Sequence, residues 1–217
     1  MRKLVLAMSL VLAGAVSAQA GSLQNGGFEA GMDKWKSSSD GAGWVGVVTD
    51  FGVWGPYEGQ NFAWLKTDGA GNLQTLWQKI NLNAGDVVSF RYFFSEDNIY
   101  EDIAGAELLD KDKNPAVAGL MLVGNAGETN PPGTWEYFAF APVPANGKYI
   151  LGFGVANVSG SSTTTVDSYL GVDAVNVNSG YEPDPQPMAP IPEPLTMLGV
   201  SLGAAGLAGY IRKRLIA

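Results

Sequence analysis

The stretch Lys148-Tyr149-Ile150-Leu151-Gly152-Phe153-Gly154-Val155-Ala156-Asn157 decides the fold of this chain. Large apolar residues stand at every second position of it, from Tyr149 to Val155. Successive side chains of a β-strand point to opposite faces, so these residues would share one face and pack against a core. The turn sequence Ala145-Asn146-Gly147 precedes the stretch and favours a strand start at this point. We therefore predict a half-buried β-strand over Lys148–Asn157.

Similar short runs, rich in Val, Phe, Tyr and Thr, fill the middle of the chain and alternate with Gly, Asn and Asp clusters. Two of the turns are well marked, at Asn83–Asp86 and Pro131–Gly133. The other predicted strands are Trp44–Thr49, Asn61–Leu65, Leu73–Asn81, Val87–Ser95, Ala104–Asp110, Gly119–Val123, Trp135–Ala141 and Tyr169–Asn176. Nine strands without a long amphipathic helix predict an all-β domain, a two-sheet antiparallel β-sandwich of the jelly-roll type.

Each end of the chain carries an apolar run that has no strand pattern. Residues 1–20 have a charged start, an apolar core and the small-residue site Ala18-Gln19-Ala20, which is typical of a cleaved signal peptide. Residues 21–179 would form the sandwich domain, and the proline-rich residues 180–190 an extended linker. At the other end, Leu195–Ile211 is an apolar run that suits a short transmembrane helix. The basic Arg212-Lys213-Arg214 behind it predicts a stop-transfer signal.

The order of features in residues 191–217 is specific. Pro192-Glu193-Pro194 comes first, the apolar helix follows, and the basic end closes the chain. This tail resembles the PEP-CTERM sorting signal of Gram-negative bacteria. The resemblance implies recognition by an exosortase, transient contact with the inner membrane, and cleavage near the Pro-Glu-Pro motif. It also implies export to the outer surface or extracellular matrix.

Charge and missing residue types limit the function. The chain has 13 basic and 21 acidic residues, and five of the basic ones lie in the two terminal signals, so the processed form would carry a net charge near −13. Such a charge repels nucleic acid, which we exclude as a partner. The chain has no Cys and no His, which removes histidine-based catalysis. Carboxylate-only chemistry, as in a glycoside hydrolase, remains open, but no acid pair is recognisable and we predict no enzyme.

The sandwich region shows a second resemblance. Asn25-Gly26-Gly27-Phe28-Glu29 is followed by Trp35, Gly133-Thr134-Trp135 comes late, and Ser168–Val175 closes the region with Asp173. The order of these pieces, with Gln74–Leu82 between them, is similar to that in carbohydrate-binding-module jelly rolls of the galactose-binding-like type. Sandwich folds carry many functions, so the resemblance bears on fold more than on ligand.

In the resembled family the opening Glu and the closing Asp bind a structural calcium, which implies a calcium site at Glu29 and Asp173. Backbone carbonyls of Gly59–Asn61 would add ligands, because Ca²⁺ prefers hard oxygens. The alternative is that Glu29 is a surface acid and Asp173 a ladder-end acid. The acidic segment Glu96–Asp102 is a competing cation site or a solvated loop. Asp110–Pro115 begins like an EF-hand loop but lacks its glycine and is better explained as a hairpin turn.

Sugar binding needs aromatic rings that stack on pyranose faces, with polar groups beside them. The irregular loop Phe51–Tyr57 carries aromatics that loop chemistry does not require. Trp77 would share a sheet face with Lys79, with Arg91 nearby. The glycan-binding candidates are Trp44, Trp54, Tyr57, Trp77, Tyr92 and Tyr100. Core packing is the alternative for each of them, and it is what we expect for Trp35, Trp64, Trp135, Phe28, Phe138 and Phe153.

Together these features predict a secreted, exosortase-sorted, non-catalytic surface or matrix protein that binds glycan through a β-sandwich with a structural calcium. Two alternatives remain open. One is a structural or adhesion protein of the exopolysaccharide matrix with a protein partner. The other is a glycoside hydrolase, which would need two facing carboxylates in an aromatic groove.

Overall fold

The computed structural model describes residues 23–69, 71–96, 102–124, 131–157 and 167–179. This part of the chain forms ten β-strands and no helix, which confirms the predicted all-β class. The strands are β1 (Lys36–Ser39), β2 (Trp44–Val48), β3 (Phe62–Lys66), β4 (Leu73–Leu82), β5 (Asp86–Glu96), β6 (Asp102–Leu109), β7 (Leu120–Gly124), β8 (Glu136–Ala139), β9 (Gly147–Asn157) and β10 (Ser168–Ser179).

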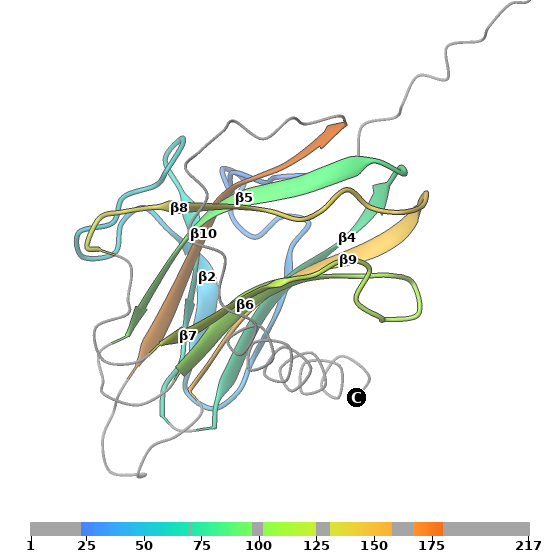
Figure 1. The fold of residues 1–217 in the computed structure, drawn as a ribbon. Coiled ribbons are helices and arrows are strands. Elements are labelled where there is room, and N and C mark those ends of the chain that lie inside the picture. The colour runs from blue at the N-terminus through green and yellow to red at the C-terminus, as the bar shows by residue number, and fades with distance from the viewer. Residues whose placement is uncertain (1–22, 70, 97–101, 125–130, 158–166, 180–217) are drawn as a thin grey trace, which may run out of the picture.

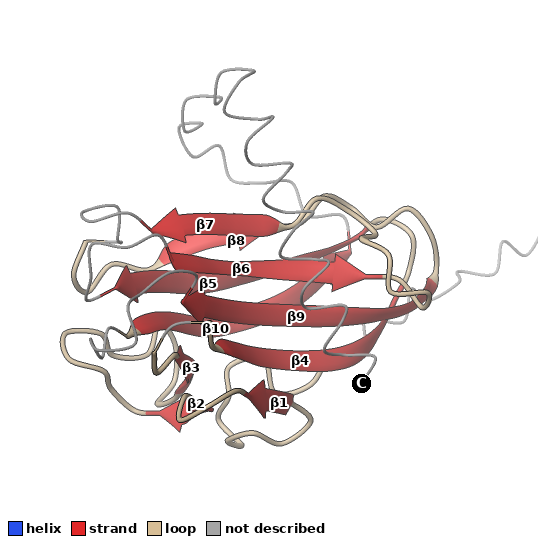
Figure 2. Ribbon diagram, turned by 90° about the horizontal axis from the view of Figure 1, so that it is seen from below, coloured by secondary structure: helices blue, strands red, loops and turns tan. Residues whose placement is uncertain are grey.

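The strands form two antiparallel five-stranded sheets that face each other (Figure 1). The β9 sheet has the order β1-β4-β9-β6-β7, which can be followed across the near layer in Figure 2. The β10 sheet has the order β2-β3-β10-β5-β8. Neighbours in each sheet are mostly distant in sequence, as expected for a jelly roll, in which strands cross from one sheet to the other.

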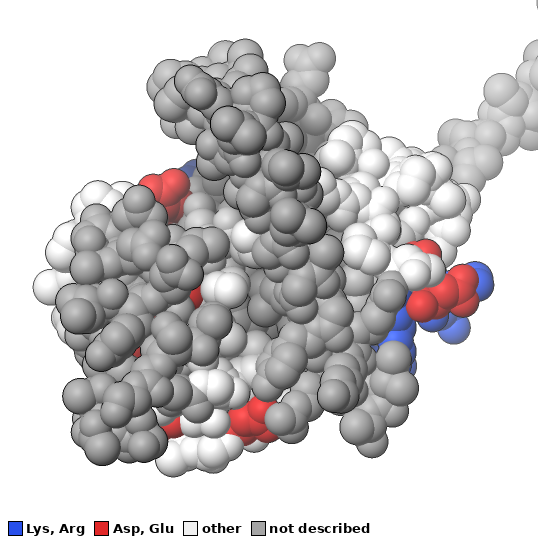
Figure 3. Space-filling view, turned by 60° about the horizontal axis from the view of Figure 1, so that its bottom comes forward, with Lys and Arg blue, Asp and Glu red and all other residues white. Residues whose placement is uncertain are grey.

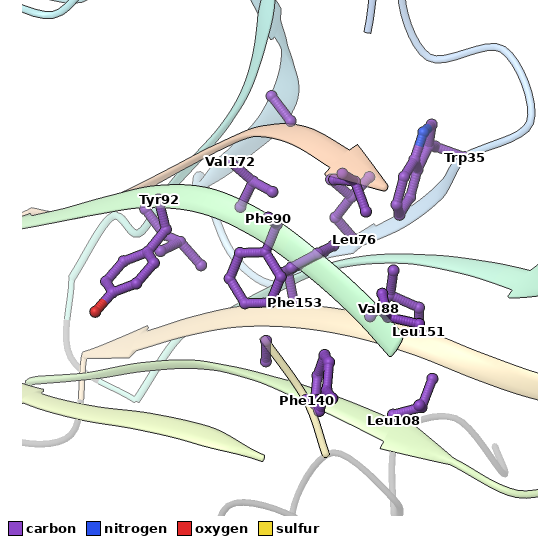
Figure 4. Close-up of a cluster of buried hydrophobic side chains, with 14 of the residues drawn as sticks. Trp35, Leu76, Val88, Phe90, Tyr92, Leu108, Phe140, Leu151, Phe153 and Val172 are labelled. Carbon is purple, nitrogen blue, oxygen red and sulfur yellow. The ribbon is translucent and has the colours of Figure 1, made fainter. Parts of the chain in front are cut away.

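The core lies between the sheets and follows the alternation predicted for β9. Tyr149, Leu151, Phe153 and Val155 are all buried. The ring of Phe153 meets that of Phe90 from β5 edge to face, with centroids 4.9 Å apart, and joins the two sheets (Figure 4). Edge-to-face contact places the positive ring edge against the negative ring face, which adds to the gain from burial.

The segment before β1 closes the open side of the sandwich. The backbone oxygen of Gly26 accepts a bond from the Val175 amide of β10, at 3.1 Å. Gln24 binds the side-chain amide of Gln78 in β4 through both its backbone groups, each at 2.9 Å. The segment therefore links the two sheets, and Phe28 beneath it is fully buried.

Asn25 holds this segment in shape. Its side chain donates to the backbone oxygens of Gly31 and Asp33 and accepts from the amide of Ala30. Its own backbone oxygen accepts the indole N–H of Trp35 at 2.9 Å. The Asn-Gly opening followed by a Trp is thus one local bonding unit that presents the Phe28 and Trp35 rings to the core.

A second apolar cluster covers the outer face of the β10 sheet. The loop Phe51–Tyr57 folds back over this face, and Phe51 and Trp54 exchange backbone hydrogen bonds of 2.8 and 2.9 Å. Trp54 stacks on Phe93 with centroids 4.5 Å apart, and Phe62 is fully buried beside them. This face is therefore largely closed by the protein itself.

Nine of the strands lie where the sequence predicts them, with ends that shift by one to three residues. The tenth, β1, has the sequence Lys-Ser-Ser-Ser, and all four residues are exposed. It carries no apolar alternation because it is an edge strand whose side chains face solvent. Asp110–Pro115 is confirmed as the hairpin turn between β6 and β7, where Asp110 accepts the amides of Asp112 and Asn114.

The signal peptide at 1–20 and the C-terminal linker and sorting signal at 180–217 lie outside the described residues, so the predictions for them stand as predictions. Most of the acidic segment Glu96–Asp102 also lies outside. Its last residue, Asp102, is buried in β6 and accepts a hydrogen bond from the Ser168 hydroxyl. The described residues contain no helix of the length and apolar character that a membrane crossing requires.

Candidate functional site

The aromatic candidates for sugar binding do not converge on one surface. Trp44, Trp54 and Tyr57 lie on the outer side of the β10 sheet. Trp77 lies on the outer face of the opposite, β9 sheet, and Tyr92 lies between the sheets. Tyr100 falls outside the described residues.

Two of these candidates are buried and offer no ring face to a ligand. Trp54 is only 8% exposed, because its ring completes the cluster over Phe93 and Phe62. Tyr92 is 7% exposed, because even-numbered residues of β5 point into the core. Burial, with the charge of Glu136 adding to it, raises the pKa of the Tyr92 phenol to about 12. The prediction that Trp54 of the Phe51–Tyr57 loop stacks on a sugar is therefore corrected. The prediction that Tyr92 binds a sugar is corrected for the same reason.

Tyr57 and Trp44 are exposed, at 47% and 41%, but each already has a packing partner. The Arg91 guanidinium lies 4.5 Å from the Tyr57 ring and 4.9 Å from that of Tyr137. Such a cation–π contact covers one face of the Tyr57 ring, as the Lys36 ammonium, 5.2 Å from the centroid, does for the Trp77 ring. The expected proximity of Arg91 to Trp77 is wrong, because odd-numbered residues of β5 face outward on the other sheet.

Trp77 is the candidate with free space around it. It lies in β4, directly opposite Lys36 of β1 on one side and Gly152 of β9 on the other. Gly152 adds no side chain to the sheet surface beside the ring, whereas Gly154 and Gly105 are buried and the backbone of Leu120 lies against Gly105. The indole is partly exposed and forms the wall of a shallow groove, the Trp77 groove.

The Trp77 groove has two hollows, one on each side of the indole. The hollow over β9 and β6 is small, about 10 Å³, little more than the space for one water molecule, and is lined by Thr75, Leu76, Trp77, Glu107, Leu109, Ile150, Gly152 and Phe153. The hollow toward β1 is lined by Gln24, Lys34, Lys36, Trp77, Gln78 and Lys79. The predicted sharing of a face by Trp77 and Lys79 is confirmed. An aromatic wall beside carboxylate, hydroxyl and amine groups is the combination that fixes a sugar.

Glu29 and Asp173, the predicted calcium ligands, hold the two ends of one loop. Asp173 Oδ2 accepts the amides of Tyr57 and Glu58, at 2.8 and 3.1 Å. Glu29 Oε1 accepts the amides of Gln60 and Asn61, at 2.8 and 3.1 Å. These groups are backbone amides, whereas the expectation was that backbone carbonyls of Gly59–Asn61 would point to a metal. The described residues contain no cluster of three or more acidic or other ligating side chains.

The two carboxylates differ in environment. Asp173 is fully buried in β10. Burial raises its pKa to about 6; the neighbouring Glu58 charge acts in the same direction, and the amides oppose it. Glu29 is exposed, and the amide of Gln60 lowers its pKa. Among the described residues no Lys or Arg forms a salt bridge with Asp173. A buried carboxylate beside a second acid is suited to a hard cation, but Asp173 Oδ2 and Glu29 Oε1 already accept backbone amides.

No protein-family model matches the chain, and the search of curated proteins gives no match. Among solved structures, the carbohydrate-binding module TmCBM61 in complex with β-1,4-galactotriose is 18% identical; the match covers 72% of this chain and 97% of the module, with a TM-score of 0.52. The domain has a two-sheet jelly roll similar to that of this module. At this identity the likeness shows the fold alone.

Other jelly-roll matches have lower TM-scores. The N-terminal cellulose-binding domain of β-1,4-glucanase C from Cellulomonas fimi is 13% identical, with 76% and 98% of the two chains covered and a TM-score of 0.43. The K3 adhesin domain of Lys-gingipain from Porphyromonas gingivalis W83 is 14% identical, with 73% and 98% covered and a TM-score of 0.46.

The sequence analysis did not identify Lys34 and Lys36, which line the Trp77 groove. Both lie next to Trp35, whose ring points into the core, so that neighbouring side chains point away from it. The alternation of Lys34, Trp35 and Lys36 was the sequence signal that could have placed both lysines on the outer surface. It was missed because β1 has no apolar pattern of its own.

Proposed function

We propose that this protein is a non-catalytic glycan-binding protein and that a sugar lies against Trp77 in the Trp77 groove. The observation that carries the proposal is the partly exposed indole, with an open hollow toward β1 on one side and Gly152, which has no side chain, on the other. A pyranose ring is apolar on its faces and needs a flat aromatic surface with room beside it. Glu107, Lys36 and Lys79 beside the indole supply hydrogen-bond partners for its hydroxyl groups.

A binding role is favoured over glycoside hydrolysis by the groove's acids. A retaining glycosidase places two carboxyl groups about 5 Å apart, and an inverting one about 6.5–9.5 Å apart. Glu107 is the one acid among the residues that line the two hollows of the Trp77 groove. Hydrolysis requires a second acid facing Glu107, so the lining of the two hollows favours binding over hydrolysis.

We further propose that the protein is exported and sorted to the outer surface or matrix of a Gram-negative bacterium. The signal sequence at 1–20 and the Pro192-Glu193-Pro194 tail support this. An exosortase is the proposed partner during sorting, with the inner membrane as a transient contact. A net negative, Cys-free and His-free domain that binds polysaccharide suits an extracellular matrix.

A protein-binding role in adhesion or matrix structure is the second candidate. It is favoured by the exposed apolar residues on the β10 side, where Trp44, Val53 and Tyr57 are 41%, 64% and 47% exposed. Exposed apolar groups that gather on one side are a frequent mark of protein interfaces. This surface and the Trp77 groove lie on opposite sheets, so substitutions can separate the two roles.

We expect Trp77→Ala to weaken polysaccharide binding at least about tenfold, because a central aromatic anchor carries much of the binding free energy. Affinity electrophoresis of the purified protein on a panel of neutral and acidic polysaccharides, β-1,4-galactan included, measures this. Trp44→Ala removes an exposed Trp from the other sheet and is the matched control, with binding unchanged.

Loss of binding in Trp44→Ala alone would assign recognition to the β10 side and remove the proposal. Equal loss in both Trp variants would show that binding is not specific to the Trp77 groove and would also remove it. Absence of binding to every polysaccharide, together with capture of a matrix protein that depends on Trp44, would favour the adhesion role.

We also propose a structural calcium held by Asp173 and Glu29, with Glu58 beside them; the ion would supply positive charge to a buried carboxylate. Since the folded pKa of Asp173 is raised to about 6, the stability that its proton contributes is present at acid pH and is lost as pH rises through that value. Calcium replaces the proton only when the carboxyl is ionised.

Calcium is therefore expected to raise the melting temperature at pH 7.5 by roughly 5–10 °C at a hundredfold excess over its Kd, and by less at pH 5. Differential scanning calorimetry in EDTA and in calcium measures the shift, and Glu29→Gln with Asp173→Asn should abolish it. Identical melting temperatures in EDTA and calcium at pH 7.5 would remove the site.

A further inference from the structure

One hollow of the Trp77 groove is lined only by neutral and basic residues. Lys34, Lys36 and Lys79 surround it, with Trp77 and two glutamines completing the lining. All three lysines are exposed. Lys34 pairs loosely with the exposed Asp33, at 3.6 Å, and among the described residues Lys36 and Lys79 have no salt bridge. This side of the groove therefore presents positive charge to a ligand.

Strand pairing keeps these charges on one face. Lys36 is directly opposite Trp77, and its ammonium nitrogen lies 5.2 Å from the ring centroid. Lys79 follows two residues after Trp77 and so points to the same side. Lys148 of β9 pairs with Asn81, which makes it a diagonal neighbour of Lys79 on this face. Three lysines thus flank the indole, and Lys148 lies farther along the same face.

This gathering of lysines on one face is unexpected for an acidic chain, whose net charge is −8. Other basic residues of the domain are engaged elsewhere: Lys66 pairs with Asp167 at 2.7 Å, and Arg91 lies between two tyrosine rings. In Figure 3 most of the Lys and Arg atoms in view lie at one edge, with Asp and Glu atoms among them. The surface charge is unevenly distributed.

We propose that the Trp77 groove selects an acidic polysaccharide whose sugar units carry carboxylates, a uronate polymer. This inference rests on the proposed glycan-binding function and names its substrate class. The sugar ring lies against the indole, its carboxylate faces the lysine hollow (the hollow lined by Lys34, Lys36 and Lys79), and its hydroxyls face Glu107 on the other side. Carboxylate–ammonium pairs at an exposed site add modestly to affinity and more to selectivity.

The same arrangement argues against a nucleic acid. A nucleic-acid strand brings one phosphate per nucleotide along its whole length, and Glu107 beside Trp77 would face that charge. The acidic body of the protein would repel the remainder of the strand. A uronate polymer also carries one carboxylate per sugar and meets the same repulsion from the acidic body. It differs from a nucleic acid in offering free hydroxyls that can bond Glu107 and an apolar pyranose face that can lie on the indole.

Polygalacturonate and its fully methyl-esterified form test the inference, because they share a backbone and differ in charge. We expect polygalacturonate to bind the purified protein about tenfold more tightly at low salt, and the difference to shrink in 0.5 M NaCl, where the Debye length is only about 4 Å. The Lys36→Gln, Lys79→Gln double variant should lose that difference. The Lys111→Gln, Lys113→Gln double variant removes equal charge at the distant β6–β7 turn and should retain it.

Equal binding of the two polymers, or loss of the preference in both double variants, would overturn the charge selection while the Trp77-dependent binding still supports the proposed function. Binding that is indifferent to Trp77→Ala would overturn both. Tighter binding of a single-stranded oligonucleotide than of polygalacturonate would assign the lysines to nucleic acid instead. Melting temperatures of the variants check that each one is folded.

Discussion

Replacing Gly26 by alanine is expected to lower the free energy of unfolding by about 3 kcal/mol, and the melting temperature by roughly 10 °C. A Cβ atom at this position would overlap the backbone oxygen of Val175. That oxygen belongs to β10 at the centre of its sheet and cannot move as a side chain does. The hydrogen bond from the Val175 amide to Gly26 would be lost with the contact, and the opening segment would separate from the sandwich.

Gly152→Ala is the matched control for the same change of residue. Its added Cβ would meet only the Glu107 side chain, at 3.7 Å, which is ordinary contact. We expect its free energy of unfolding to change by less than about 1 kcal/mol. Thermal melts followed by circular dichroism compare the two variants. Equal melting temperatures would show that residues 24–28 do not lie against β10.

Phe153→Ala is expected to lower the free energy of unfolding by about 3–5 kcal/mol, the usual cost of removing a buried aromatic side chain. Phe153 is 2% exposed and contacts the rings of both Phe90 and Trp35, so the change would leave a cavity between the sheets. Urea denaturation measures the loss as a lower midpoint at unchanged slope.

Ile150→Ala, in the same strand but on its outer face, provides the comparison. Its side chain is partly exposed and borders the Trp77 groove, so we expect a loss of about 1 kcal/mol. A loss as large as that of Phe153→Ala would contradict the assignment of the two faces of β9.

The sequence was most informative where local chemistry and core packing agree. The alternation from Tyr149 to Val155 identified both the strand and its buried face. The Asn25–Glu29 opening was identifiable because its residue types have separate local roles. Asn25 bonds the turn, Gly26 allows close approach, and Phe28 fills the core. Turn sequences with Asn, Gly and Pro then marked most strand ends.

The positions of the other candidate residues depend on tertiary contacts, which cannot be derived from a single sequence. Trp54 has the setting of an exposed loop residue, yet the loop folds back and buries it on Phe93. Arg91 and Trp77 were expected to be neighbours, but sheet order places them on opposite faces. The lysine hollow forms because β1 pairs with β4. The sequence of β1, Lys-Ser-Ser-Ser, has no apolar alternation from which this strand could be predicted.

The central place of β10 has a mechanical consequence. Its ladder with β5 runs from Ser168 to Ser179, and β3 pairs with its other edge. Any chain attached after Ser179 would pull along this strand, at right angles to its hydrogen bonds, so that many bonds share the load and break together rather than one at a time. A protein tethered from that end would load the ladders of β10 with β5 and β3 in shear, whereas the Trp77 groove belongs to the other sheet.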